Sequence, residues 1–261
     1  RYPEPRPLGT APSMVSDSEK DTSEPVFLSA GDTALVVQYG ETVDPVINRR
    51  VRLLAAALAD NRRDGIVDLV PTMRSLMIHY DPLVLSRAEL VASVRPLIKA
   101  TPDLMETTRR WRIPVCYEGE CGPDMKAVAE SLSISPAEVI NLHSGVDQEV
   151  FMMGFLPGFP YLGLLPEIFD LPRRLEPRVK VPPRSISVAA RQTTVYTVDS
   201  PGGWHLIGRT PIDFYNPHRA EPILVTAGDR VRFEPISLDA YHSTRQAVER
   251  DEFEIDCDPL I

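Results

Sequence analysis

The first half of the chain contains four short apolar runs whose length and alternation are typical of β-strands. These runs lie at residues 26–31, 33–40, 66–71 and 75–80. Asp44-Pro45 stands before apolar residues spaced three and four apart, which predicts a helix with Asp44 as N-cap and proline at its first position. Ser86 and Glu89 form a capping box for a second helix. The order β-β-α-β-β-α predicts a compact α+β domain over residues 26–108.

The second half of the chain changes character, because short β-like runs are now separated by proline and glycine. These runs lie at residues 110–117, 150–155, 185–190, 194–198, 204–208, 222–226 and 230–236. Two short helices are expected at 124–132 and 135–144, the second with Ser135 in a capping box. Many short strands with frequent turns predict a β-barrel or sandwich over residues 109–240.

Both ends of the chain are expected to be tails. Residues 1–25 carry five of the 26 prolines and little apolar content, which is typical of a disordered segment. Residues 241–261 are predicted to form an acidic C-terminal tail, in which the stretch 249–258 is expected to be solvated.

Composition excludes several classes of protein. The 261 residues are 43% hydrophobic, which is enough to bury a core, and no apolar run is long enough to predict a membrane span. The formal charge of −9 argues against a nucleic-acid surface. Three cysteines, no zinc-finger spacing and no secretory signal favour a reduced, cytoplasmic protein without a metal site.

One window reverses the sign of the charge. Between Arg173 and Arg191 there are six cationic residues and a single acid, Glu176, so the window has a net charge of +5. Arginine suits carboxylate and phosphate groups because its guanidinium offers a planar fork of donors. The alternative is a solvated basic face that is paired with neighbouring acids.

A dense aromatic loop lies just before this window, at residues 153–163. Its glycines and prolines favour a rigid, tightly turned backbone, and its aromatic side chains offer a wall for a pocket. The alternative is an Ω-loop that packs on its own aromatic rings. The candidate binding residues are Phe155, Pro157, Gly158, Phe159 and Tyr161.

A second cluster joins Gln192-Thr193 to the segment 201–211, in which a Gly-Gly turn precedes a strand. Strand alternation places His205 and Arg209 on one face, where both could reach a ligand. Histidine is the side chain best suited to proton transfer near neutral pH, although a lone strand histidine is more often structural.

Several motifs of known chemistry are absent from the sequence. There is no P-loop, no G-x-G-x-x-G, no G-x-S-x-G and no H-E-x-x-H. A nucleotide site on this chain would therefore not be of the Walker type.

Four segments together resemble the family of the 5-oxoprolinase B subunit, also called allophanate hydrolase subunit 1, which includes a sporulation histidine-kinase inhibitor. They are GFLPGFPYLG, PRRLEPRVKVP, Gln192-Thr193 and SPGGWHLIGRTP, and the resemblance spans residues 26–236. It implies a small N-terminal α/β sandwich domain followed by a cyclophilin-like β-barrel. It also implies a homologous partner, the C subunit (allophanate hydrolase subunit 2-like), and a third component, the A subunit.

The activity that the resemblance implies is ATP-dependent hydrolysis of 5-oxo-L-proline to glutamate, with ATP used by the whole complex. We expect Arg178, Lys180 and Arg209 to bind the substrate carboxylate or a phosphate, with Thr193 beside them. Gln192 would bind an amide and His205 would move a proton, so His205, Arg209 and Gln192 are the catalytic candidates. A ureido carboxylate such as allophanate is a related substrate, and inhibition of a sensor histidine kinase without catalysis is the alternative function.

The segment after Val181-Pro182 departs from the family pattern, which usually reads A-G-S-V-G-I-A-G-G-Q-T-G-I-Y-P. Five side chains stand here where that pattern has glycine: Arg184, Ser187, Ala190, Arg191 and Thr194. Side chains in place of close backbone approach are expected to narrow the pocket or change its charge.

Overall fold

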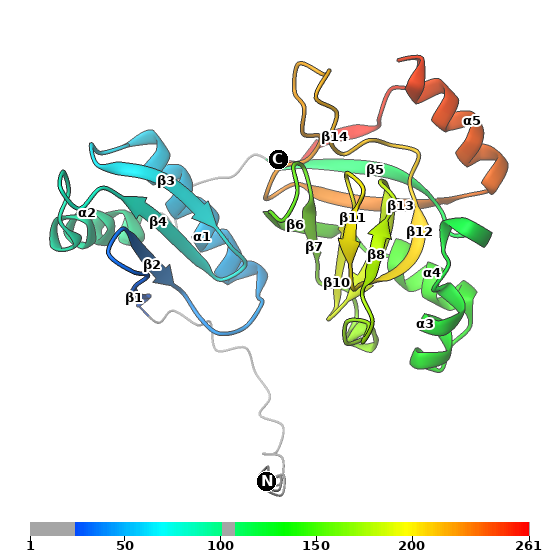
Figure 1. The fold of residues 1–261 in the computed structure, drawn as a ribbon, viewed down its shortest axis with the longest axis horizontal. Coiled ribbons are helices and arrows are strands. Elements are labelled where there is room, and N and C mark those ends of the chain that lie inside the picture. Colours follow the sequence, from blue (N-terminus) through cyan, green and yellow to red (C-terminus); the bar gives the residue numbers. More distant parts are fainter. Residues whose placement is uncertain (1–23, 101–107, 261) are drawn as a thin grey trace, which may run out of the picture.

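The computed structural model describes residues 24–100 and 108–260, which form two units side by side (Figure 1). The predicted N-terminal tail falls almost wholly outside the described residues. The first unit has the expected β-β-α-β-β-α order. Its elements are β1 (Val26–Ser29), β2 (Ala34–Gln38), α1 (Pro45–Asp60), β3 (Ile66–Pro71), β4 (Ser75–Tyr80) and α2 (Arg87–Ala100).

Both helices of the first unit begin where the sequence predicts. The Asp44 carboxylate accepts hydrogen bonds from the backbone N–H groups of Val46 and Ile47, at 2.7 and 3.0 Å. At α2 the Glu89 N–H donates to the Ser86 hydroxyl, and the Glu89 carboxylate accepts from the Ser86 N–H at 3.0 Å. These bonds satisfy backbone donors that the first turn of a helix leaves unpaired.

The first unit is a four-stranded antiparallel sheet in the order β1-β2-β4-β3, with both helices packed into one apolar core. Leu35 and Val37 of β2 face this core together with Leu76 and Ile78 of β4, and all four are fully buried. Alternation along the strands therefore fixes which face of the sheet the helices cover.

The second unit is a β-barrel of seven strands with helices at its ends and sides (Figure 1). Its first elements are β5 (Thr108–Cys116), a 3₁₀ turn (Gly119–Cys121), α3 (Met125–Leu132), α4 (Pro136–Ser144), β6 (Gln148–Met153), β7 (Pro160–Gly163), a second 3₁₀ turn (Glu167–Phe169) and β8 (Arg178–Val181). The remaining elements are β9 (Ser185–Ala189), β10 (Gln192–Val195), β11 (Ser200–Gly202), β12 (His205–Arg209), β13 (Arg230–Ile236), α5 (Leu238–Glu249) and β14 (Cys257–Leu260).

The barrel runs in the order β12-β9-β10-β7-β6-β13-β5 and closes where Arg209 of β12 pairs with Cys116 of β5. The pairing of β13 with β5 is parallel over seven residue pairs. β8 and β11 form a separate two-stranded ribbon. The expected α+β architecture with a C-terminal barrel is thus confirmed.

One expected strand does not form. Residues 222–226 make only an isolated bridge, between Ile223 and Tyr215. The segment instead folds back against residues 214–216, because the Asn216 N–H donates to the Pro222 carbonyl at 2.8 Å and the Leu224 N–H donates to the Phe214 carbonyl at 3.0 Å.

The acidic segment 241–261 is not a tail over its whole length, because it contributes to a helix and a strand, although most residues from 249 to 258 are exposed to solvent as expected. α5 begins at the N-cap Ser237 and buries Tyr241 beside Cys116 and Cys121. β14 adds an antiparallel strand to the free edge of β5. Two of the six acids of this segment, Asp256 and Asp258, form ion pairs with Arg112 of β5.

The two units touch through α1. Arg52 of α1 forms an ion pair with Glu149 of β6 at 2.9 Å, and both side chains are largely buried. The side-chain amide of Gln192 lies 3.4 Å from the sulfur of Met73.

Candidate functional site

A small pocket of about 110 Å³ lies where the aromatic loop meets the ribbon strand β11. It brings together two segments that the sequence singled out, the loop at 153–163 and the Gly-Gly-Trp turn at 201–204. Its lining residues are Phe155, Phe159, Tyr161, Arg173, Tyr196, Pro201, Gly202, Gly203 and Trp204.

The walls of the pocket are a cluster of aromatic rings in edge-to-face contact. Phe159 is at its centre, with ring centroids 5.4 Å from Phe155 and 5.2 Å from both Tyr161 and Tyr196. Tyr161 in turn contacts Trp204 at 6.1 Å. Such offset contacts are favourable beyond the area they bury, so the cluster gives the pocket a rigid shape.

Backbone geometry at three positions sets the pocket shape. Gly158 has φ +67°, and a Cβ there would stand 2.9 Å from the Cβ of Tyr215. A Cβ on Gly202 would overlap the Tyr196 hydroxyl oxygen, so only glycine fits over that ring. Phe155 itself has φ +68° and is 62% exposed, which places a large apolar ring at the mouth of the pocket.

The two tyrosine hydroxyls in the pocket stay protonated at neutral pH. Burial raises the pKa of Tyr161 and of Tyr196, and the nearby Arg173 guanidinium only partly opposes this. Both hydroxyls are therefore available as hydrogen-bond donors.

The aromatic-loop predictions divide into two groups. Phe155, Phe159 and Tyr161 line the pocket. Pro157 and Gly158 do not line it but shape the loop, and the Pro157 carbonyl accepts a hydrogen bond from the Thr197 hydroxyl at 2.7 Å.

Most of the basic window is paired with acids from elsewhere in the chain. Arg174 and Arg178 both bind the Asp124 carboxylate, at 3.1 and 2.7 Å. Lys180 binds Asp199 at 2.8 Å on the surface. The structure therefore bears out the alternative of a paired basic face for these three cations, and their anion-binding role stays a prediction.

Gln192 and Thr193 lie outside the pocket lining. The Thr193 hydroxyl is fully buried and lies 3.1 Å from Nε2 of His143 in the barrel core. Gln192 contacts Met73 of the first unit. Strand alternation explains why these neighbours on β10 point to different surroundings.

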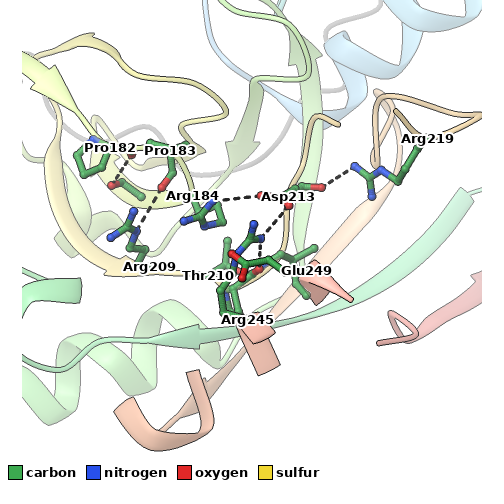
Figure 2. A network of polar contacts seen from close by, with 12 residues as sticks. Pro182, Pro183, Arg184, Arg209, Thr210, Asp213, Arg219, Arg245 and Glu249 are labelled. Atoms are coloured by element: carbon green, nitrogen blue, oxygen red, sulfur yellow. Dashed lines mark hydrogen bonds and ion pairs between the residues drawn. The ribbon is translucent and has the colours of Figure 1, made fainter. Parts of the chain in front are cut away.

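His205 and Arg209 bind different carbonyl groups. Nε2 of His205 lies 2.9 Å from the Pro172 carbonyl oxygen. Arg209 donates from Nε to the Pro183 carbonyl at 3.2 Å (Figure 2). The register of β12 shifts between Leu206 and Gly208, which breaks the simple alternation on which the shared face was predicted. Neither residue lines the pocket.

The sequence prediction missed Arg173, Tyr196 and Trp204 as pocket residues. Trp204 was assigned to a strand face, and Arg173 was counted only as part of the charged window. The sequence feature that could have pointed to them is the Gly202-Gly203 pair, because a turn without side chains lets aromatic rings approach the ribbon backbone.

The sequence of residues 25–225 matches the family described as carboxyltransferase domain, subdomain C and D. This chain belongs to that family. The B subunit of 5-oxoprolinase from Bacillus subtilis (strain 168) is 36% identical over 227 residues, which cover 83% of this chain and 95% of the relative. The B subunit of 5-oxoprolinase from Escherichia coli O157:H7 is 39% identical over 206 residues, covering 78% of this chain and 93% of the relative.

Solved structures share the fold of this chain. The protein TTHA0988 superposes with a TM-score of 0.70 at 38% identity, over 78% of this chain and 40% of that chain. This chain thus spans about two fifths of that protein. Urea amidolyase of K. lactis shares the fold, with a TM-score of 0.75 at 19% identity, over 92% of this chain and 17% of that chain.

Three of the five positions where the carboxyltransferase family pattern has glycine keep a backbone conformation that favours glycine. Arg184, Ala190 and Arg191 have φ values of 69°, 47° and 62°. The other two positions, Ser187 and Thr194, are cross-strand partners whose hydroxyl oxygens lie 2.7 Å apart, fully buried. Each of these two side chains therefore satisfies the other.

The Ser187–Thr194 pair lies behind the aromatic pocket. Thr194 stands opposite Tyr161 of β7, and Ser187 stands opposite Leu206 of β12, which packs against the rings of the cluster. Side chains directly opposite in a sheet share a face. The two hydroxyls thus lie on the pocket side of the barrel wall without lining the pocket, and the narrowing expected from them stays a prediction.

Arg184 belongs to a network of ion pairs and hydrogen bonds around Asp213 (Figure 2). Its guanidinium lies 3.3 Å from one carboxylate oxygen of Asp213, and Arg245 of α5 binds the other at 2.8 Å. Arg219 donates to the Asp213 carbonyl at 2.6 Å, and Arg245 also binds Glu249. The network fastens α5 to the loop after β12, so Arg184 has a structural partner.

Among residues 24–100 and 108–260 no group of three or more His, Cys, Asp or Glu side chains could hold a metal ion. Over the same residues, no helix has the length and apolar character needed to cross a membrane.

Proposed function

We propose that this chain is a component of an ATP-dependent amide hydrolase of the 5-oxoprolinase type. In this proposal it works with a homologous C subunit, and the complete enzyme also contains an A subunit. The substrate is 5-oxo-L-proline, a five-membered lactam with one carboxylate.

The observation that carries the proposal is a pocket sized for one small ring, formed by segments within the matched region. Sites for drug-sized ligands run from about 300 to 1,000 Å³, whereas a cavity of about 150 Å³ holds benzene. A pocket of about 110 Å³ is smaller than both, so it admits at most a single small ring. The likeness to the B subunit of 5-oxoprolinase supports a lactam as that ring.

The chain's own residues would bind and orient the lactam. Phe159 and Trp204 offer apolar surface for the ring, and their burial excludes water from one side. The protonated hydroxyls of Tyr161 and Tyr196 can donate to the ring carbonyl oxygen, where negative charge grows when the amide is attacked. His205, Arg209 and Gln192 keep their proposed catalytic role only if a partner protein or the substrate reorganises their present contacts.

The pocket does not fit ATP. A nucleotide is too large for a space of this size, and the sequence has no P-loop. We therefore derive no phosphate-transfer step on this chain, and the proposal assigns ATP to the complex.

The test is co-expression of this chain with the C and A subunits from the same genome. We expect ATP hydrolysis that depends on 5-oxo-L-proline, with glutamate as product. Turnover of allophanate alone would move the substrate to the ureido class. The absence of turnover with either substrate in an intact complex would refute the proposal, and inhibition of histidine-kinase autophosphorylation by the chain alone would then support the binding-protein alternative.

A further inference from the structure

Arg173 differs from the other cations of the window at 173–191, because no carboxylate of the described residues lies within ion-pair distance of it. The other five cations have such partners: Asp124 binds Arg174 and Arg178, Asp199 binds Lys180, Asp213 binds Arg184, and Glu167 lies 4.0 Å from Arg191. Arg173 is thus the guanidinium of this window that remains open to an incoming anion.

Arg173 is also the one cation among the residues that line the aromatic pocket. Its guanidinium carbon lies 5.6 Å from the centroid of the Trp204 ring. A guanidinium over an aromatic face keeps its N–H donors free at its edges, and these match the two oxygens of a carboxylate. Stacking on Trp204 therefore orients the Arg173 guanidinium and leaves its N–H groups free to donate hydrogen bonds.

Arg173 is the only charged residue in the lining of the aromatic pocket. Its remaining lining residues are aromatic rings, Pro201 and two glycines, and it contains no acid. Its small, partly apolar volume strengthens a charge-assisted hydrogen bond relative to one in water.

We infer that Arg173 recognises the carboxylate of a small ring-shaped ligand held in the aromatic pocket. This inference rests on the proposed function for the choice of 5-oxoproline as the probe. The chemical class is a five-membered ring with one anionic substituent, the ring against Trp204 and the carboxylate on the guanidinium edge.

The experiment measures binding to the full chain by calorimetry with two matched ligands. 5-Oxoproline carries the carboxylate, and 5-oxoprolinamide carries a neutral amide on the same ring. We expect the unmodified chain to prefer the carboxylate at least tenfold. Arg173→Gln should weaken 5-oxoproline binding roughly 10- to 100-fold and leave the amide unchanged, so that the preference disappears. Arg173→Lys should recover part of the preference, because it restores the charge without the planar fork.

The matched control is Lys126→Gln, which removes an exposed cation paired only with Glu130 on α3. It should keep the affinity and the preference of the unmodified chain. Equal loss of both ligands in Arg173→Gln would overturn the inference, since Arg173 would then only support the pocket walls. An unchanged preference in that variant, or no binding to the unmodified chain, would overturn it as well.

The two proposals can fail separately. If the carboxylate preference depends on Arg173 but the intact complex does not cleave 5-oxoproline, the inference stands and the proposed function falls. If the complex cleaves 5-oxoproline and Arg173→Gln keeps the preference, the proposed function stands and Arg173 has no recognition role.

Discussion

His143 provides a sharp test of the packing of the barrel. The side chain is fully buried, with Nδ1 2.8 Å from the Tyr117 hydroxyl and Nε2 3.1 Å from the Thr193 hydroxyl. Its ring stacks on Phe233, with centroids 4.9 Å apart. Burial lowers the pKa of His143 from 6.5 to about 3, because the charged imidazolium would lose its hydration.

The sign of the pH effect follows from this lowered pKa. Below pH 6.5 the unfolded chain takes up a proton at His143, whereas the folded chain does so only near pH 3. The unfolded state therefore gains stability as the pH falls through this window, and the folded state loses about 1.4 kcal/mol of relative stability per pH unit. Above pH 6.5 the residue contributes no pH dependence.

The perturbation is His143→Gln, which removes the ionisable group and keeps a donor and an acceptor. At pH 7.5 the variant should be less stable by about 1–3 kcal/mol, because its hydrogen bonds and its packing are poorer. At pH 5 the two proteins should differ by roughly 2 kcal/mol less than at pH 7.5, since only the unmodified chain carries the protonation penalty. Urea unfolding at a series of pH values measures this gap.

The control for His143→Gln is His218→Gln, which removes an exposed histidine and should follow the unmodified chain at every pH. A constant gap between His143→Gln and the unmodified chain from pH 7.5 to pH 4.5 would refute the reasoning. The imidazole would then carry no protonation penalty in the folded barrel.

Three further experiments test the pocket and its supports. Gly202→Ala should lower the midpoint of thermal unfolding and abolish binding of the ring ligand, because the added Cβ would overlap the Tyr196 hydroxyl oxygen. Gly203→Ala is the control and should do neither, because the atom nearest to its added Cβ is 3.7 Å away. Ser187→Ala and Thr194→Val should each lower the free energy of unfolding in urea by about 1–3 kcal/mol. A double-mutant cycle should give a coupling energy of about 1 kcal/mol between the two residues. Fully additive losses would contradict the shared hydrogen bond. Asp124→Asn should destabilise the barrel by about 2 kcal/mol, because it leaves two arginines without their carboxylate, and an unchanged midpoint in urea would contradict that role.

Local signals predicted the N-terminal unit well. The caps at Asp44 and Ser86 lie within a few residues of the backbone groups that they satisfy, so the sequence contains the whole interaction. Alternation in β2 and β4 likewise predicts the buried face from the strand alone. Boundaries set by contacts of this range can be inferred without tertiary information.

The C-terminal segment shows where such inference stops. Its acids do not indicate that two of them form ion pairs with Arg112 of β5, which is far away in sequence. The free edge of β5 that β14 completes is also invisible in the segment itself. Charge counted along a sequence does not reveal which partners the fold supplies.

The basic window shows the same limit of counting charge along the sequence. Its net charge suggested several anion-binding residues, but Asp124 and Asp213 come from outside the window and bind three of its arginines. What distinguishes Arg173 is its place beside Trp204, and that depends on how the ribbon folds over the aromatic loop. The candidate site could therefore be located from its aromatic motif, whereas its cation could be chosen only from the structure.

The substituted glycine positions show that glycine loss alone does not predict loss of the site. A left-handed conformation costs a non-glycine residue about 1–2 kcal/mol, and Arg184 and Arg191 both carry this cost. Arg184 offsets it through its ion pair with Asp213, and Arg191 donates to the Leu165 carbonyl at 3.1 Å. The strained positions at both ends of β9 therefore have partners, and the loss of glycine there does not by itself remove the aromatic pocket.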